Sequence, residues 1–403
     1  MNEKKVFPDT FLWGSATSSY QVEGGIDNND WAQGAREGKV PPCGTACDHY
    51  NRYEQDFDIA KSLGHNTHRF SIEWSRIEPE EGKFDEKEIE HYREVLRALQ
   101  ARGIYPLITL WHFWLPLWFS RSGGWERKDA PEVFSRYCTY VVEQLGDLCD
   151  NYATINEPMV FSGFGYIRGE WPPFYKKSFL KYLNVIVQLI RGHNLSYQSI
   201  KATFPRKKVG IVKHIVVFGA NKNPFNIFLA WTFNLGWTHL FMRRVYKNTD
   251  WVGLNYYNRR VFGDTCVLGK TDMGWNIDPR GIYEALHMLW KYKKPIYIAE
   301  AGCADAHDRF RADYIRDTVE SISEAIQDGV DVRGYCYWSL LDNYELAEGF
   351  EKRFGLVEVN FDTQERTIRP SALVYRDLIL SHSHPKHEEG SIFFIKNRKD
   401  HIL

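Results

Sequence analysis

Apolar residues recur along the chain at helical spacing, and a short apolar run follows each helical segment. In residues 51–64 four apolar side chains fall on one helical face, and Gly64 supplies a stop. Residues 85–103, 132–146 and 312–329 repeat this pattern, each followed by a run rich in β-branched and aromatic residues. Strands that alternate with helices of this length predict a parallel sheet.

Eight segments have the character of strands, and together they predict the fold class. They are residues 11–18, 66–72, 105–111, 152–156, 208–217, 251–256, 295–300 and 333–338. Eight strand–helix units in a chain of 403 residues predict an α/β fold with a single (β/α)8 TIM barrel. No linker rich in Pro, Gly or Ser divides it, so we expect residues 1–380 to form the barrel and 381–403 to be a flexible tail.

Polar and aromatic residues gather where the predicted strands end. A barrel interior needs apolar layers, and the chemistry of such barrels lies at the C-terminal ends of the strands. A single buried histidine would more often be an ordinary core residue. Polar or aromatic residues follow seven of the eight predicted strands, however, and this favours a functional site. They are Gln21, Arg69, His112, Asn156, Glu157, Asn255, Tyr257, Glu300, Trp338 and Glu345.

Composition and charge narrow the classes of function. The formal net charge of -1 predicts neither a nucleic-acid nor a membrane partner. No apolar run is long enough to span a bilayer, and the N-terminus lacks the apolar core of a signal peptide, which predicts a cytoplasmic protein. The seven cysteines are scattered, and we find no metal-ligand or cofactor motif, so no metal and no cofactor are expected. The aromatic content of 15% fits either core packing or stacking on a flat ligand.

Two carboxylates end strands that a closed barrel would place on opposite walls. Glu157 lies in the run Thr-Ile-Asn-Glu-Pro, and Glu300 ends Tyr-Ile-Ala-Glu. Two such groups suit glycoside hydrolysis, in which one acts as an acid and the other attacks the anomeric carbon. Arg69 near Glu300 would keep it ionised, whereas Glu157 beside neutral Asn156 could stay protonated. An ordinary ion pair is the alternative for either glutamate.

Several long motifs in the same order resemble glycoside hydrolase family 1, the retaining β-glycosidases. The similarity runs from about Phe7 to Leu380. The motifs are FLWGSATSSYQVEGG, HRFSIEWSRIEP, LITLWHFWLPLWF, GGW, TINEP, VGLNYY, YIAEAG and YWSLLDNYE followed by GFEKRFGLVEV.

The resemblance implies a role for each residue of the site. Glu300 matches the catalytic nucleophile of the family and Glu157 its acid/base, in a reaction without a cofactor. Asn156 matches the residue that binds the 2-hydroxyl of the sugar. The other matches fall into two groups: Gln21, His112, Trp338 and Glu345 bind further sugar hydroxyls, while Arg69, Asn255 and Tyr257 position the nucleophile or line its pocket.

Four residues depart from the family pattern near the predicted site. Ala299 and Ala301 flank Glu300 where the family has polar side chains, Trp114 replaces a small residue, and Leu346 stands where the family has a tryptophan that helps to hold the sugar. These changes are either drift or an altered, less polar pocket.

The resemblance predicts a small β-glucoside or β-galactoside as the partner. The alternative is a repurposed or engineered barrel that binds a flat apolar ligand, in which a carboxylate acts as a general base or has no hydrolytic role. The oligomeric state is left open.

Overall fold

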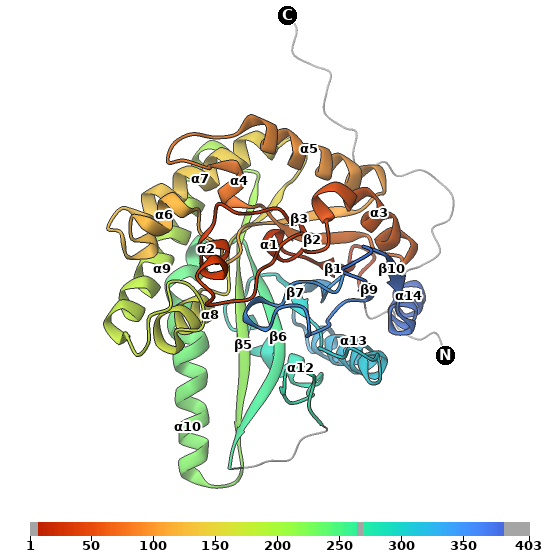
Figure 1. Ribbon diagram of the computed structural model, residues 1–403. Coiled ribbons are helices and arrows are strands. Elements are labelled where there is room, and N and C mark those ends of the chain that lie inside the picture. Colours follow the sequence, from red (N-terminus) through yellow and green to blue (C-terminus); the bar gives the residue numbers. More distant parts are fainter. Residues whose placement is uncertain (1–6, 264–268, 383–403) are drawn as a thin grey trace, which may run out of the picture.

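The computed structural model describes residues 7–263 and 269–382 (Figure 1). The strands are β1 (Leu12–Ala16), β2 (Thr67–Ser71), β3 (Tyr105–Trp111), β4 (Asn151–Asn156), β5 (Lys208–Ala220), β6 (Trp251–Phe262), β7 (Ile296–Ala301), β8 (Val332–Trp338), β9 (Val357–Val359) and β10 (Arg366–Ile368). The α-helices are α1 (Ser19–Val22), α2 (Asp30–Arg36), α3 (His49–Ser62), α4 (Trp74–Ile77), α5 (Glu86–Ala101), α6 (Leu117–Arg121), α7 (Ala130–Leu145), α8 (Pro158–Ser162), α9 (Phe179–Thr203), α10 (Pro224–Asn234), α11 (Leu240–Val245), α12 (Gly281–Trp290), α13 (Arg311–Gln327) and α14 (Pro370–His382).

Strands β1 to β8 form one closed parallel barrel in chain order. The barrel closes where β1 pairs with β8, so that Leu12 lies beside Gly334 and Ala16 beside Trp338. The longer helices surround the strands (Figure 1). All eight predicted strands are confirmed, and so is the (β/α)8 fold class. The carboxyl ends of the strands therefore meet at one face of the barrel, where the site is expected.

Helix α5 shows how the local sequence positions a barrel helix. Its N-cap residue, Asp85, accepts hydrogen bonds from the backbone N–H groups of Lys87 and Glu88, at 2.9 and 3.4 Å. Glu86 and Glu88 in the first turn complement the positive end of the helix dipole. The buried residues of α5 include Ile89, which begins the apolar face predicted for 85–103. The helix thus packs by the periodicity that was visible in the sequence.

Strands β5 and β6 continue beyond the barrel, together with α10 (Figure 1). They end at Ala220 and Phe262, whereas the sequence pattern predicted ends at 217 and 256. The pairing of β4 with β5 reaches only Val212, and the pairing of β6 with β7 reaches Tyr256. Past those points the two strands pair only with each other. We call residues 216–240 and 257–263 the arm.

The last described helix, α14, ends at His382. The expected boundary at residue 380 therefore falls within this helix, and the expected flexible tail lies, from residue 383, outside the described residues. No helix among the described residues is long and apolar enough to cross a membrane.

Candidate active site

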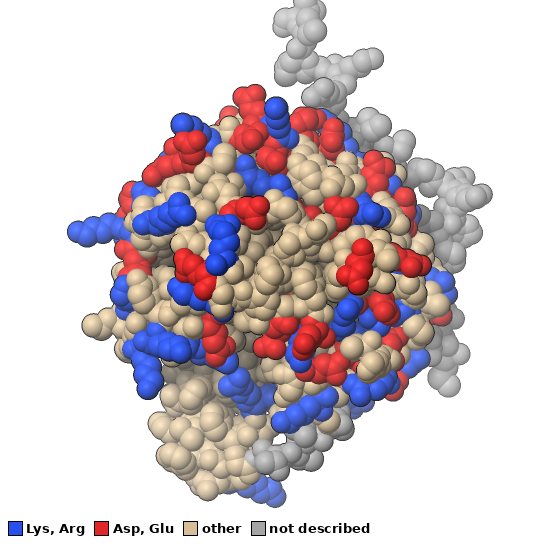
Figure 2. All heavy atoms as spheres, in the orientation of Figure 1, with Lys and Arg blue, Asp and Glu red and all other residues tan. Residues whose placement is uncertain are grey.

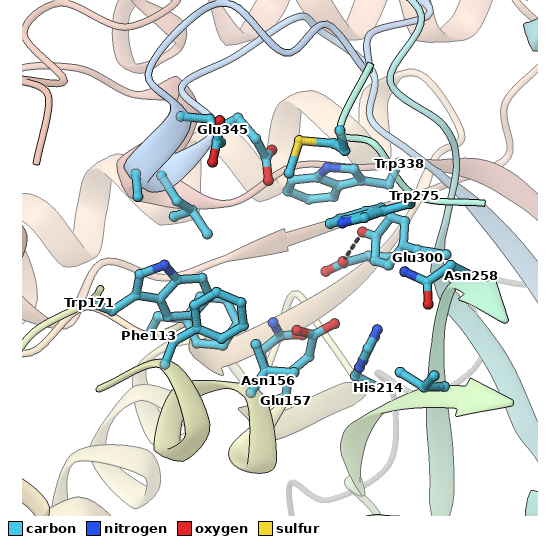
Figure 3. Close-up of a pocket in the computed structure, with 18 of the residues that line it drawn as sticks. Phe113, Asn156, Glu157, Trp171, His214, Asn258, Trp275, Glu300, Trp338 and Glu345 are labelled. Carbon is cyan, nitrogen blue, oxygen red and sulfur yellow. Dashed lines mark hydrogen bonds between the residues drawn. The ribbon is translucent and has the colours of Figure 1, made fainter. Parts of the chain in front are cut away.

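A cavity of about 240 Å³ opens at the carboxyl ends of the barrel strands (Figure 3). The structure brings together there most of the residues predicted for the site, although they come from all parts of the chain. Those that line the cavity are Gln21, His112, Asn156, Glu157, Tyr257, Glu300, Trp338, Glu345 and Leu346. Arg69 and Asn255 are buried beside it and bond to its carboxyl groups.

Glu300 is held from both sides by hydrogen-bond donors. Arg69 donates from Nη1 to one carboxyl oxygen. The Tyr257 hydroxyl donates to the other, through the hydrogen bond dashed in Figure 3. Arg69 is itself fixed, because its Nε donates to Thr109 Oγ1 at 3.0 Å and its Nη2 to Asn156 Oδ1 at 2.8 Å. An ionised carboxylate is a pure acceptor, so these two donors match the charged form of Glu300.

Glu157 accepts a hydrogen bond from a neutral amide and has an unusual backbone. It directly follows β4 and precedes α8, with a φ of 44° in the left-handed region that few residues with a Cβ adopt. Its carboxyl group accepts a hydrogen bond from Asn255 Nδ2 at 2.7 Å. Burial and, second, the nearby charge of Glu300 raise the pKa of Glu157 to about 8. A group with this pKa is largely protonated at neutral pH and can donate a proton.

Asn156 and His112 form a fixed pair at the floor of the site. Because Arg69 donates to Asn156 Oδ1, the amide presents Nδ2 to His112 Nε2, at 3.1 Å. His112 Nε2 then accepts, which leaves the proton of the neutral ring on Nδ1. Burial, and then the charge of Arg69, lower the pKa of His112 well below its usual value. Nδ1 is buried and has no hydrogen-bond partner in the described structure, and His112 is one of the residues that line the cavity.

Gln21 and Glu345 occupy another wall of the cavity. Gln21 Nε2 donates to the backbone oxygen of Tyr344 at 2.8 Å and to Asn343 Oδ1 at 3.1 Å. It also lies 3.5 Å from Glu345 Oε2. Burial, followed by the charges of Glu300 and Glu157, raises the pKa of Glu345 to about 8. A protonated Glu345 both donates and accepts hydrogen bonds, as recognition of a neutral polyol requires.

Three of the four residues expected to alter the pocket do not line it. Ala299 and Ala301 precede and follow Glu300 in β7, and successive side chains of a strand point to opposite faces of the sheet. They therefore point away from the cavity, and Ala299 packs with Ala153, Val212 and Trp251.

Trp114 also lies away from the cavity. It is stacked against His112 at 5.8 Å between ring centroids and packs with Tyr20 and Trp31. Of the four residues, only Leu346 lines the cavity.

The fifth strand, β5, has two polar residues near the cavity that were not predicted for the site. His214 of β5 lines the cavity beside Asn255 of β6. Lys213 precedes it and is fully buried, with its Nζ 4.9 Å from the Trp237 ring centroid. The Lys-His pair inside an otherwise apolar strand could have indicated these residues in the sequence. It was missed because polar residues were sought at strand ends, and β5 continues beyond the pair. Aromatic loop residues were missed too, among them Phe113, Trp171 and Trp275 (Figure 3).

The close approach of β7 and β8 above the barrel depends on a glycine. A Cβ added to Gly302 would lie 1.9 Å from the backbone oxygen of Trp338. Only glycine therefore lets the chain leave Glu300 while Trp338 stays in the wall of the cavity. Among the described residues, no group of three His, Cys, Asp or Glu side chains could hold a metal ion.

Comparison with known proteins gives relatives over nearly the whole chain. A 1,4-β-D-glucan glucohydrolase from Thermotoga neapolitana is 34% identical, with 93% of this chain and 98% of that protein covered. The β-galactosidase of Saccharolobus solfataricus is 30% identical over 92% of this chain and 94% of its own.

Solved structures agree in fold with this chain. A β-glycosidase from Pyrococcus horikoshii superimposes with a TM-score of 0.87 at 37% identity, covering 94% of this chain and 98% of its own. A β-glucosidase from Thermotoga maritima in complex with deoxynojirimycin also has a TM-score of 0.87, at 31% identity, with 94% and 99% covered. The family model for glycosyl hydrolase family 1 matches residues 3–237 and 263–384. The chain therefore belongs to glycosyl hydrolase family 1, and it is a glycoside hydrolase of the β-glycosidase type.

Proposed function

We propose that the chain is a retaining β-glycosidase that hydrolyses β-D-glucosides or β-D-galactosides by double displacement, with Glu300 as nucleophile and Glu157 as acid/base. The observation that carries this assignment is the asymmetry between the two carboxyl groups. Glu300 receives a guanidinium and a phenol donor, whereas Glu157 receives only an amide and has its pKa raised to about 8. Environments that differ in this way separate a nucleophile from an acid.

The reaction would proceed in two steps. Glu300 attacks the anomeric carbon while Glu157 donates its proton to the departing glycosidic oxygen, which leaves a glycosyl ester on Glu300. Glu157, now a carboxylate, removes a proton from the incoming water. That water attacks the same carbon, and Glu300 leaves as a carboxylate. Two inversions restore the original β configuration.

We assign the sugar contacts to the neutral hydrogen-bonding groups around the carboxylates. Asn156 would bind the 2-hydroxyl, where a contact strengthens in the transition state. His112 Nδ1, Gln21 and Glu345 would bind the more distant hydroxyls, and Trp338 would face the ring. The names of the relatives support gluco- and galactosides as the substrate class. The alternative of a scaffold for a flat apolar ligand is not favoured, because three of the four residues that motivated it lie outside the cavity lining.

A 2-deoxy-2-fluoro-β-D-glucoside with a good leaving group tests the assignment. The fluorine slows both steps, so the glycosyl ester should accumulate and inactivate the enzyme with one equivalent of label. Digestion and mass spectrometry should then place the label on the peptide that contains Glu300. A label on another residue, or slow turnover with an α-configured product, would overturn the proposal.

The pH profile offers a separate prediction. We expect kcat/KM for cellobiose to fall as the pH rises through about 8, because the protonated form of Glu157 is the proton donor and its pKa is about 8. The control is 2,4-dinitrophenyl β-D-glucoside, whose leaving group needs no proton. Its profile should decline less over this range, because only the loss of the proton from Glu345, whose pKa is also raised to about 8, affects both substrates alike. Identical profiles for the two substrates would contradict the role of Glu157.

Leu346 provides a prediction on sugar binding. The Leu346→Trp substitution restores the residue that the family resemblance implies and should lower KM for p-nitrophenyl β-D-glucoside roughly fivefold, since an aromatic platform adds ~1 kcal/mol. The matched control is Leu373→Trp on the surface of α14, which should leave KM unchanged. An unchanged KM in both variants would show that Leu346 does not face the sugar.

A further inference from the structure

The arm exposes a large apolar surface around α10. The helix contains no charged residue, and Phe225, Phe228 and Trp231 are 65%, 59% and 60% exposed. Figure 2 shows this surface as a tan lobe below the charged body of the molecule. A surface helix normally carries polar residues on its outer face. A contiguous apolar patch of this kind marks an interaction site.

The exposed side chains are not displaced members of the core. The inner side of α10 is already packed, because Ala230 contacts Val216 and Phe218 of β5 in a separate apolar cluster. On the outer side, Phe228 and Trp231 stack on each other at 6.2 Å between ring centroids. Leu240, at the start of α11, extends the surface and is 55% exposed. We call Phe225, Ile227, Phe228, Trp231, Phe233 and Leu240 the α10 surface.

The charge of the surrounding sequence is strongly one-sided. Residues 171–249 contain thirteen Lys and Arg residues and no Asp or Glu. The same stretch holds eleven of the fourteen large apolar side chains that are exposed in the described structure. Lys222, Arg243, Arg244 and Lys247 are exposed there, and none of them forms an ion pair within the described residues. Apolar and basic groups therefore occur together in this stretch of the sequence, although Lys181, Arg191, Lys201 and Lys207 pair with carboxylates from outside it.

We propose that the α10 surface docks the protein on an anionic lipid bilayer, with its aromatic side chains in the interface and the neighbouring basic residues on the lipid headgroups. Exposed aromatic residues beside lysine and arginine suit the boundary between acyl chains and headgroups. A second copy of the chain fits less well, because a symmetric contact would bring two basic surfaces together. The proposal replaces the expectation of no membrane partner, which rested on a net charge of -1 averaged over the chain.

The position of the arm connects this surface to the cavity. Val216 and Phe218, which pack beneath α10, also line the cavity, together with Trp237. The cavity would thus open beside the lipid surface. If the proposed β-glycosidase function holds, on which this step depends, the aglycone is of the alkyl or lipid type and enters along these apolar side chains.

Vesicle flotation of the full chain tests the docking without any activity measurement. Vesicles of phosphatidylcholine with phosphatidylserine should bind the protein, pure phosphatidylcholine should bind it weakly, and added salt should release it. The double variant Phe228→Ser/Trp231→Ser should bind roughly tenfold less. Arg243→Ala/Arg244→Ala should lose the preference for phosphatidylserine. The matched control Leu373→Ser/Leu380→Ser removes two exposed apolar side chains of α14 and should bind as the wild type does.

Four results would overturn the proposal. The first two are no binding of the wild-type protein to either vesicle and equal binding by the wild type and the Phe228→Ser/Trp231→Ser variant. The third is a loss of binding only when residues 383–403 are removed. The fourth is a wild-type dimer in light scattering that does not bind vesicles and that the Phe228→Ser/Trp231→Ser variant no longer forms. The rates of hydrolysis of octyl and methyl β-D-glucoside, compared with each other, test the proposed preference for an alkyl aglycone separately. Failure of both substrates would count against the β-glycosidase function and leave the flotation result intact.

Discussion

The Glu300→Gln substitution should reduce kcat/KM for p-nitrophenyl β-D-glucoside on the order of 10⁴-fold or more, equivalent to at least ~5.5 kcal/mol of transition-state stabilisation. The amide cannot form the glycosyl ester, so both steps of the reaction are lost. Its oxygen still accepts the hydrogen bond from Arg69, its NH2 group can donate to the Tyr257 oxygen, and the cavity should keep its shape. Initial rates with the purified variant measure the effect.

The control for this experiment is Glu73→Gln. Glu73 is buried, lies outside the cavity lining and accepts hydrogen bonds from Ser19 and Ser75. Its substitution should leave kcat/KM near the wild-type value, while both variants keep a cooperative thermal transition. Retention of more than about a hundredth of the wild-type activity by Glu300→Gln would rule out its role as nucleophile.

The second large effect is expected at Glu157, and it should depend on the leaving group. Glu157→Gln should lower kcat/KM for cellobiose by roughly 10²–10⁴-fold, because the departing sugar needs a proton. For 2,4-dinitrophenyl β-D-glucoside the decline should be slight, since that leaving group departs as an anion. Steady-state rates with the two substrates give the comparison. Equal losses for both would contradict general acid catalysis by Glu157.

Azide distinguishes the two carboxylates by product. In Glu157→Ala, azide should attack the glycosyl ester on Glu300 and yield the β-glucosyl azide. In Glu300→Ala, it should occupy the space of the missing nucleophile and yield the α-glucosyl azide. Nuclear magnetic resonance of the product reads the configuration. The reverse pattern would exchange the two roles.

The barrel could be predicted from the sequence because its signals are local. Each strand is a short apolar run and each helix shows a helical apolar face, so α5 and the strands other than β5 and β6 were predicted close to their observed bounds. The site could be predicted because the polar residues follow the strands directly. Asn156 and Glu157 are the clearest example, since Asn156 ends β4, Glu157 follows it directly, and both line the cavity.

Orientation was harder to predict than location. Ala299 and Ala301 adjoin Glu300 in the sequence, and a substitution there looked like a change of the pocket. Strand alternation turns both side chains outward, and it could have been applied to the sequence itself. The stacking of Trp114 behind His112 depends instead on a turn and on contacts with Tyr20 and Trp31, which sequence spacing does not contain.

The arm divides β5 into two parts of different local stability. As far as Val212, β5 is paired on both sides, with β4 and with β6. From Val217 to Ala220 it is paired with β6 alone, through partners that run from Arg259 to Phe262. Fluctuations that open this two-stranded ribbon need not disturb the barrel. Amide protons of 217–220 should therefore exchange with solvent long before those of 209–212, and one strand would report both local opening and global unfolding.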